Sequence, residues 1–182
     1  KLAVKSIFAR SILDSRGFPA VEVTVEAGKL KGVFGVPSGA STGSAEALEL
    51  LDGGPEFLGR GVSKAVHNVN EVLAKRLKGQ NIFDQAGIDN ILIDLDGTKY
   101  KSRYGANAIL GVSGAVCKVA AEARKQPLYK YIGSLHKNKK FHIPRFLMVF
   151  IEGALHGDNN LNLQEYWIIP NKKTVWESLR LA

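Results

Sequence analysis

The alternation of apolar and polar residues early in this chain constrains its fold more than any other feature. Val21, Val23 and Val25 alternate with acidic or hydroxylated residues, which is the period-two pattern of a strand with one buried face. Two further strand-like runs flank this one, and glycine-containing turns separate the three. Short connections of this kind favour a three-stranded antiparallel meander. The predicted strands cover residues 4–9, 20–27 and 33–36.

After the strands, the spacing of apolar residues changes to three and four. This spacing extends over residues 60–77 and predicts an amphipathic helix. A shorter helix is predicted at 84–94. A third, at 106–125, is rich in small apolar residues that allow close packing, and Pro127 limits its extension. Strands followed by helices are typical of an α+β domain, which we place at residues 1–135.

The pattern changes again from His142. Two apolar strand-like runs, at 143–151 and 163–169, are separated by a segment rich in Gly and Asn, and a helix begins near residue 174. Because the chain lacks an initiator methionine and this last helix has no stop signal, we expect the sequence to be cut at both ends. We place a second, truncated domain at residues 136–182.

The formal net charge of +8 is spread along the chain, and its densest cluster is Lys137, Lys139 and Lys140. No aromatic pattern suited to stacking on bases accompanies these lysines, so we do not expect nucleic-acid binding. No apolar run approaches the roughly 18 residues of a membrane helix, and the start of the chain is not a secretory signal. A single cysteine, Cys117, cannot form an internal disulfide. These features predict a cytoplasmic protein that does not bind membranes.

A loop of small and hydroxylated residues, Val36 to Gly43, lies between the predicted strands and helices. Glycine lets the backbone approach a ligand closely, and hydroxyl oxygens suit a hard cation such as Mg²⁺. A Gly/Ser loop is also a common plain connector. The loop therefore indicates a binding site only together with other motifs.

Three polar residues in the helical region are interpreted as structural. Asp96 is followed by Gly97 and is typical of a turn. We expect Asn107 to form hydrogen bonds locally at the start of its helix. Cys117 lies in an apolar helical pattern and is expected in the core.

Several further motifs occur in a fixed order along the chain. They are Asp14–Pro19 followed by Val21–Val23, then Glu46–Leu50, Leu95–Thr98, Gly105–Ser113 and Gln164-Glu165. Together with the loop, they make nearly the whole chain resemble enolase, the phosphopyruvate hydratase family. The resemblance implies a lyase that depends on Mg²⁺ and converts 2-phosphoglycerate to phosphoenolpyruvate in glycolysis. It also implies a homodimer in the full-length family.

By the same resemblance, residues 136–182 contain the first strands of an α/β barrel. A closed barrel takes about 250 residues, so the barrel is incomplete within this chain. We therefore expect an α+β meander-and-helix domain followed by two barrel strands without their neighbours.

The resemblance assigns roles to residues of the first domain. Ser41 matches the loop serine that ligates the second Mg²⁺, and Gly39 and Ala40 match positions in the mobile loop that closes over substrate. Arg10 and Glu22 match positions that pair across the dimer interface. From the residues alone, these two are exposed charges on strands.

Three residues of the second domain are matched as well. His156 matches a substrate-contacting histidine, and Glu165, beside Gln164, matches a carboxylate at the side where hydroxide leaves. Without the resemblance, a histidine in a Gly/Asn-rich loop is commonly an ordinary surface residue. Glu165 is the stronger candidate from the residues alone, because an unpaired charge within an apolar run is costly to bury.

The chain also departs from the family pattern. Phe18 stands where family members have Asn. The family pattern before the histidine is close to Asn-Val-Ile-Asn-Gly-Gly-Ser-His-Ala-Gly, whereas Glu152, Leu155 and Asp158 add two negative charges and remove a hydroxyl. Val149 and Ala154 also replace an Asn and a Gly there.

Two hypotheses about activity follow. The family's carboxylates for the first Mg²⁺, its proton-donor glutamate and its catalytic lysines have no counterpart within residues 1–182. We therefore predict that this polypeptide alone does not turn over, although it derives from a phosphopyruvate hydratase. The alternative is a catalytically inactive, enolase-derived interaction or structural module.

Overall fold

The computed structural model describes residues 2–39 and 42–181 of the chain. It divides into two compact units, Lys1–Asn138 and Lys139–Ala182.

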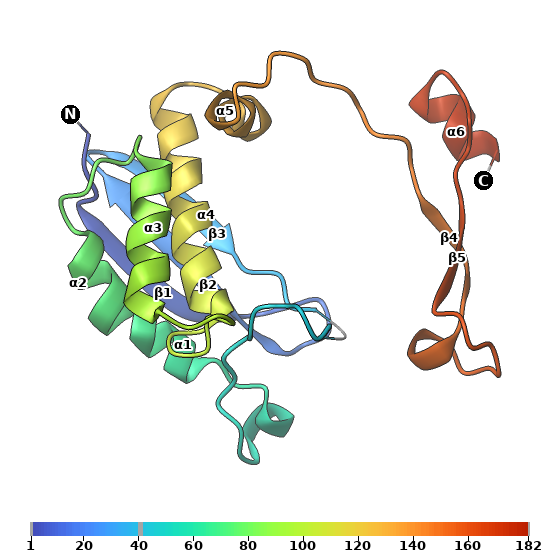
Figure 1. Ribbon diagram of the computed structural model, residues 1–182, viewed down its shortest axis with the longest axis horizontal. Helices are drawn as coiled ribbons and strands as arrows, with labels where there is room; N and C mark the ends of the chain where they lie inside the picture. Colours follow the sequence, from blue (N-terminus) through green and yellow to red (C-terminus); the bar gives the residue numbers. More distant parts are fainter. Residues whose placement is uncertain (1, 40–41, 182) are drawn as a thin grey trace. The chain divides into compact units, whose positions relative to one another are not determined.

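The first unit begins with a three-stranded antiparallel sheet in the order β1-β2-β3 (Figure 1). The strands are β1 (Ser6–Leu13), β2 (Pro19–Ala27) and β3 (Leu30–Gly35). The alternating valines of β2 are fully buried, so the predicted meander and its buried face are confirmed. β1 extends beyond its predicted end because its register with β2 continues to the pair Leu13 and Pro19.

Helices cover the buried face of this sheet (Figure 1). They are α1 (Ser63–Asn68), a π-helical turn (Val69–Leu73), α2 (Ala74–Leu77), α3 (Gln85–Asp96), α4 (Ala106–Ala123) and α5 (Leu128–Leu135), with a short 3₁₀ turn at Glu56–Gly59. α4 packs across β2 and β3, and α1 and α2 pack against β1. This arrangement confirms the α+β class.

The helix predicted at 60–77 begins at Ser63 because the side chain of Asp52 caps its first turn. The Asp52 carboxylate accepts the backbone N–H of Ser63 at 2.8 Å and of Lys64 at 2.9 Å. These two groups have no partner within the helix. An acceptor eleven residues before the helix replaces the usual capping residue next to it.

α5 was not predicted. Pro127 was interpreted only as a limit to the preceding helix, whereas it also directly precedes a new one, and Tyr131 in α5 is buried. Proline is compatible with a helix start because no intrahelical partner is needed there.

Glycine allows α4 to approach the sheet closely. A Cβ added at Gly32 of β3 would meet the carbonyl oxygen of Ala115 and lie 2.5 Å from the backbone nitrogen of Val119. On the helix side, a Cβ at Gly111 would lie 2.6 Å from Cγ2 of Val23. The backbones of α4 and β3 are therefore in contact at Gly32, and at Gly111 the backbone of α4 contacts the side chain of Val23.

The beginning of the chain pairs with the segment between α2 and α3. Ala3 forms an antiparallel bridge with Asn81. The backbone N–H of Val4 donates to the carbonyl of Gln80 at 2.8 Å, and that of Gly79 donates to the carbonyl of Val4 at 2.9 Å. We call this pairing the terminal clasp.

By length and composition, α4 is the one helix in residues 2–39 and 42–181 that could cross a membrane. This revises the expectation that no apolar run approaches that length. A core helix passes the same test, and 56% of the tested window is buried. Because α4 also packs on β2 and β3, we interpret it as a core helix.

The second unit contains two paired strands and a terminal helix. The strands β4 (Met148–Glu152) and β5 (Glu165–Ile168) are antiparallel, and a 3₁₀ turn (Ala154–His156) lies in their connection; α6 spans Val175–Leu181. Many of its large apolar side chains are exposed, including Phe150 and Trp176. Its assignment to a barrel stays a prediction.

Candidate functional site

The start of the Ser/Gly loop is anchored by Arg16. Its guanidinium lies 3.0 Å from Oδ2 of Asp14 through Nη2, which also donates to the carbonyl of Ser38 at 3.1 Å. Nη1 donates to the carbonyl of Gly39 at 3.5 Å. Hydrogen bonds from the backbone N–H groups of Phe18 and Arg16, together with the guanidinium, hold the pKa of Asp14 below its usual value. The first residues of the loop, which follow β3, are therefore held against the turn Asp14–Phe18 between β1 and β2, which we call the ionic turn.

A second contact joins the Ser/Gly loop (Val36 to Gly43) to Glu49, which lies beyond its end. The hydroxyl of Ser38 donates to Oε2 of Glu49 at 2.8 Å. Ser38 is half-buried, whereas Gly39 is exposed. Ala40 and Ser41, which the resemblance placed at the substrate and at Mg²⁺, lie outside the described residues, and their roles stay predictions.

His156 and Glu165 lie close together in the second unit. Nδ1 of His156 is 3.9 Å from Oε1 of Glu165, which is an ion-pair distance when the ring is protonated. The other carboxylate oxygen, Oε2, accepts the indole N–H of Trp167 at 2.7 Å. Both side chains are largely but not fully buried, with 24% and 21% exposed. The structure thus brings together two of the predicted site residues.

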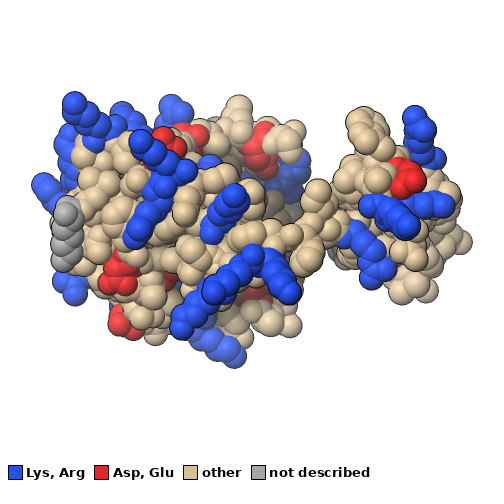
Figure 2. All heavy atoms as spheres, turned by 90° about the horizontal axis from the view of Figure 1, so that it is seen from above, with Lys and Arg blue, Asp and Glu red and all other residues tan. Residues whose placement is uncertain are grey.

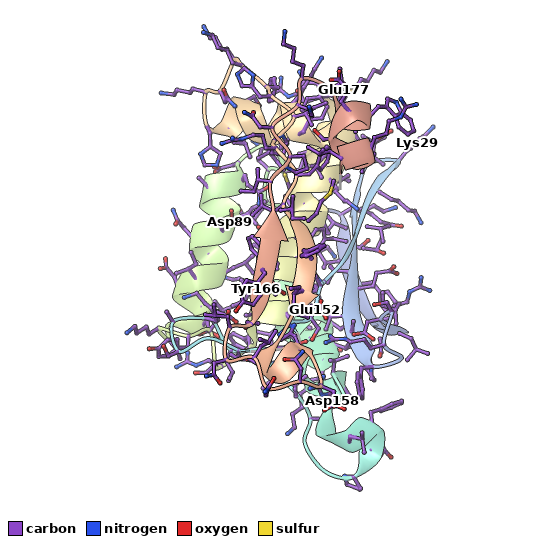
Figure 3. The ribbon with its side chains drawn as sticks, turned by 90° about the vertical axis from the view of Figure 1, so that its right-hand side faces the viewer. Lys29, Asp89, Glu152, Asp158, Tyr166 and Glu177 are labelled. Atoms are coloured by element: carbon purple, nitrogen blue, oxygen red, sulfur yellow. The ribbon has the colours of Figure 1, made fainter. Side chains whose placement is uncertain are left out.

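The connection between β4 and β5 positions His156 next to Glu165. Gly153 donates its N–H to the carbonyl of Gln164 at 2.8 Å, and the N–H of His156 donates to the carbonyl of Gly153 at 2.9 Å. The Gln164 side chain is exposed. Figure 3 labels Glu152 on β4 and Asp158 in the connection between the strands. Both carboxylates are exposed.

Arg10 and Glu22 contact each other within the chain. They face each other across β1 and β2, and Nε of Arg10 lies 2.7 Å from Oε1 of Glu22. The side chain of Arg10 remains 65% exposed. Their contact with a second subunit stays a prediction.

Among residues 2–39 and 42–181, no group of three or more His, Cys, Asp or Glu side chains could hold a metal ion. Of the residues matched to the family, only Ser41 was assigned to the metal, and it lies outside these ranges.

A pocket of about 530 Å³ lies within the first unit, and sequence reasoning missed it. Its walls come from residues 36–39 and 42–49, from α3 and Lys101, and from the first half of α4. We call it the loop pocket. Its apolar lining comes chiefly from Val36, Pro37, Ala47, Ile93, Ile109 and Leu110. Because the pocket depends on the packing of distant segments, no local sequence signal indicates it.

Two polar side chains of the first unit, those of Asp96 and Asn107, bind backbone groups elsewhere in the unit. Asp96 is fully buried and accepts the backbone N–H of Tyr104 at 2.8 Å and of Arg103 at 3.1 Å, together with both donors of Thr98. Burial alone would raise the pKa of Asp96, but these hydrogen bonds outweigh it and lower the pKa. The interpretation of Asp96 as a turn residue was therefore incomplete, because its carboxylate organises the segment up to Tyr104.

Asn107 was predicted to form hydrogen bonds locally. It accepts the N–H of Ala108 at 3.1 Å, but it also bonds both backbone groups of Leu50, which lies far away in sequence.

Cys117 was expected in the core and is half-buried. Burial, followed by the nearby Asp89 carboxylate, raises the pKa of its thiol.

Basic side chains lie scattered over the face of the first unit that is visible in Figure 2. Figure 2 shows Lys and Arg spread over the visible face, with Asp and Glu between them. A nucleic-acid site usually gathers its cations on one face, so this view gives no support to one.

One family model matches the chain. It is the model for the amino-terminal domain of enolase, and it matches residues 4–132.

Proposed function

Since this chain belongs to the enolase family and contains its amino-terminal domain, we propose that it supplies part of the site of a phosphopyruvate hydratase. The reaction is the dehydration of 2-phosphoglycerate to phosphoenolpyruvate in glycolysis. The match over residues 4–132 is the observation that carries this proposal. A cytoplasmic location and a homodimer that uses Arg10 and Glu22 belong to the same proposal.

In this proposal, His156 and Glu165 act on the substrate. Glu165 lies at the side where hydroxide leaves, and its carboxyl group can hold or move a proton there. Nδ1 of His156 lies 3.9 Å from Oε1 of Glu165. This side of the ring faces the carboxylate, so Nε2 is left to contact the substrate. The hydrogen bond from Trp167 fixes the other carboxylate oxygen. Gln164 binds substrate beside Glu165.

The Ser/Gly loop closes over the substrate and excludes water. Arg16 holds the carbonyls of Ser38 and Gly39, and Ser38 is also bonded to Glu49, which lies beyond the loop.

Members of this family generally depend on Mg²⁺, and the bound ion stabilises negative charge that develops on the substrate. Ser41 is the residue of this chain that we assign to the ion. The family's carboxylates for the first Mg²⁺ and its catalytic lysines have no counterpart in residues 1–182, so these residues by themselves are proposed not to turn over.

The alternative is a catalytically inactive module derived from enolase. The changes around His156 favour it, because Glu152 and Asp158 are exposed carboxylates near a site for a phosphate-bearing substrate. Like charges disfavour such binding.

A fusion experiment distinguishes the two. Residues 1–182 are joined to the remaining barrel of a working family member, and formation of phosphoenolpyruvate is followed in the presence of Mg²⁺. The enzyme proposal expects turnover that falls at least about 100-fold in the Glu165→Gln variant, the usual worth of a positioned acid or base. The unfused chain serves as the control and should be inactive.

An inactive, folded fusion would overturn the enzyme proposal in favour of the module. Restoring the family residues with Glu152→Asn and Leu155→Ser then identifies the cause. If these changes return activity, the substitutions before His156 are what silenced the site.

A further inference from the structure

We propose that the loop pocket binds a small organic cation with an apolar body about the size of an aromatic ring. This inference concerns the first unit alone and does not depend on the catalytic proposal. The volume of the loop pocket, about 530 Å³, lies within the range of roughly 300–1,000 Å³ that is usual for small-molecule sites.

The apolar lining is large and incompletely covered. Ile93 of α3 and Leu110 of α4 line the pocket, and 45% and 46% of their surfaces stay exposed. Pro37 in the loop and Ala47 beyond it add to the apolar lining. A ring placed between these walls would remove apolar surface from water, which is the main source of affinity for such a ligand.

The charge of the lining selects the sign of the ligand. Glu46, Glu49 and Asp89 contribute carboxylates, against a single ammonium from Lys101. The Nζ of Lys101 already donates to the carbonyl of Thr98 at 3.1 Å. The pocket is thus acidic within a chain whose net charge is +8. Opposite charge favours a cation over a neutral molecule or an anion of the same shape.

The wall around Asp89 has more hydrogen-bond acceptors than donors. Asp89 lies on α3 (Figure 3), and its Oδ1 accepts the side-chain amide of Gln85 at 3.0 Å. The same amide nitrogen also donates to Ser113, a second lining residue, so the amide lies against this wall. Its oxygen, Oε1, is buried and has no hydrogen-bond partner among the described residues. The carboxylate of Asp89, which lines the pocket, can accept further hydrogen bonds from an ammonium group.

Asp89 is therefore the residue that we assign to the charged end of the ligand. It is half-buried, where an ion pair is screened less by water than on an open surface. Glu49 is already bonded to Ser38, and Glu46 is exposed, so both add to the field of the pocket more than to a fixed contact.

The test uses benzylammonium, with benzyl alcohol as the neutral probe of matched size. Each is titrated into isotope-labelled protein of residues 1–182, and chemical shifts of backbone amides give the dissociation constants. We expect benzylammonium to bind at least about fivefold more tightly, the worth of roughly 1 kcal/mol. The shifts should centre on Ile93 and Leu110.

Two variants locate the charge. In Asp89→Asn, benzylammonium should lose most of its advantage over benzyl alcohol, whereas Asp94→Asn, a change of the same kind at an exposed position of α3, should keep it. The variant Leu110→Trp fills the pocket and should abolish binding of both probes while the protein stays folded.

Three results would overturn the proposal. They are equal affinity for the two probes, equal losses in Asp89→Asn and Asp94→Asn, and shifts that centre away from α3 and α4. The first would leave an apolar pocket without selection for a cation.

Discussion

Asn107 pairs with Leu50 as a neighbouring strand would. Its Oδ1 accepts the backbone N–H of Leu50 at 3.2 Å, and its Nδ2 donates to the carbonyl of Leu50 at 3.1 Å. One side chain at the start of α4 thus satisfies both backbone groups of a residue that belongs to no strand. Because Asn107 is only 3% exposed, water cannot readily replace it.

Removing this side chain should destabilise the first unit. Asn107→Ala leaves two backbone groups of Leu50 without a partner, and we expect a loss of about 2 kcal/mol in the free energy of unfolding. Urea denaturation measures it. Asn90→Ala, at an exposed position of α3, is the control and should change little. A loss in Asn107→Ala no greater than in the control would contradict the prediction.

The stability of the protein should fall in acid partly through Asp96. Its pKa is lowered in the folded state from an ordinary value of 3.8, so folding favours the ionised form. The contribution is fully present above pH 3.8 and disappears as pH falls through the lower folded value. Melting temperatures between about pH 2 and 6 should show this slope, which the Asp96→Asn variant should lose in part.

Asp96→Asn should also lower the melting temperature near pH 7. An amide in place of the carboxylate brings a donor against backbone N–H groups, and it weakens the charge-assisted bonds to Tyr104 and Arg103. Asp94→Asn is the control in the same helix. Parallel pH curves for the wild type and Asp96→Asn would show that Asp96 does not contribute to the acid slope.

The contact between α4 and β3 requires glycine at position 32. In Gly32→Ala, the new methyl group would overlap the backbone of α4 at Ala115 and Val119, and we expect a loss of about 3 kcal/mol. Gly35→Ala in the same strand is the control, because its Cβ would meet only Cδ1 of Ile12, at 3.5 Å. If calorimetry shows equal melting temperatures for the two variants, the close approach is not a constraint.

The ionic turn should control how open the Ser/Gly loop is. Arg16→Gln removes the guanidinium from Asp14 and from the carbonyls of Ser38 and Gly39. We expect a glutamate-specific protease to cut faster after Glu46, by several-fold, with little change in the melting temperature. Arg76→Gln, in α2, is the matched control, and equal cutting rates in the two variants would argue against anchoring by Arg16.

The local pattern was sufficient to predict the sheet. Val21, Val23 and Val25 are buried because a strand turns every second side chain to the same face, and this depends on neighbouring residues only. The same reasoning missed α5. Residues Leu128, Tyr131 and Leu135 have helical spacing, but Pro127 was interpreted as an end and not also as a beginning.

The contacts of the site could not be predicted in this way. The partner of Asn107 lies 57 residues away, so its identity depends on the complete packing of the unit. Likewise, the proximity of His156 and Glu165 depends on the pairing of Glu152 with Glu165 and on the turn between the strands. The resemblance supplied the residue types, and the pairing of distant segments determined their geometry.

The terminal clasp has a consequence for hydrogen exchange. Its two sides, at Val4 and Gln80, enclose most of the first unit, and closing a chain of roughly 75 residues costs about 4 kcal/mol in entropy. The clasp can therefore persist only while the sheet and helices between them hold the ends in place. The amide hydrogens of Val4 and Gly79 should therefore exchange with deuterium no more slowly than the amides of the sheet that holds them in place.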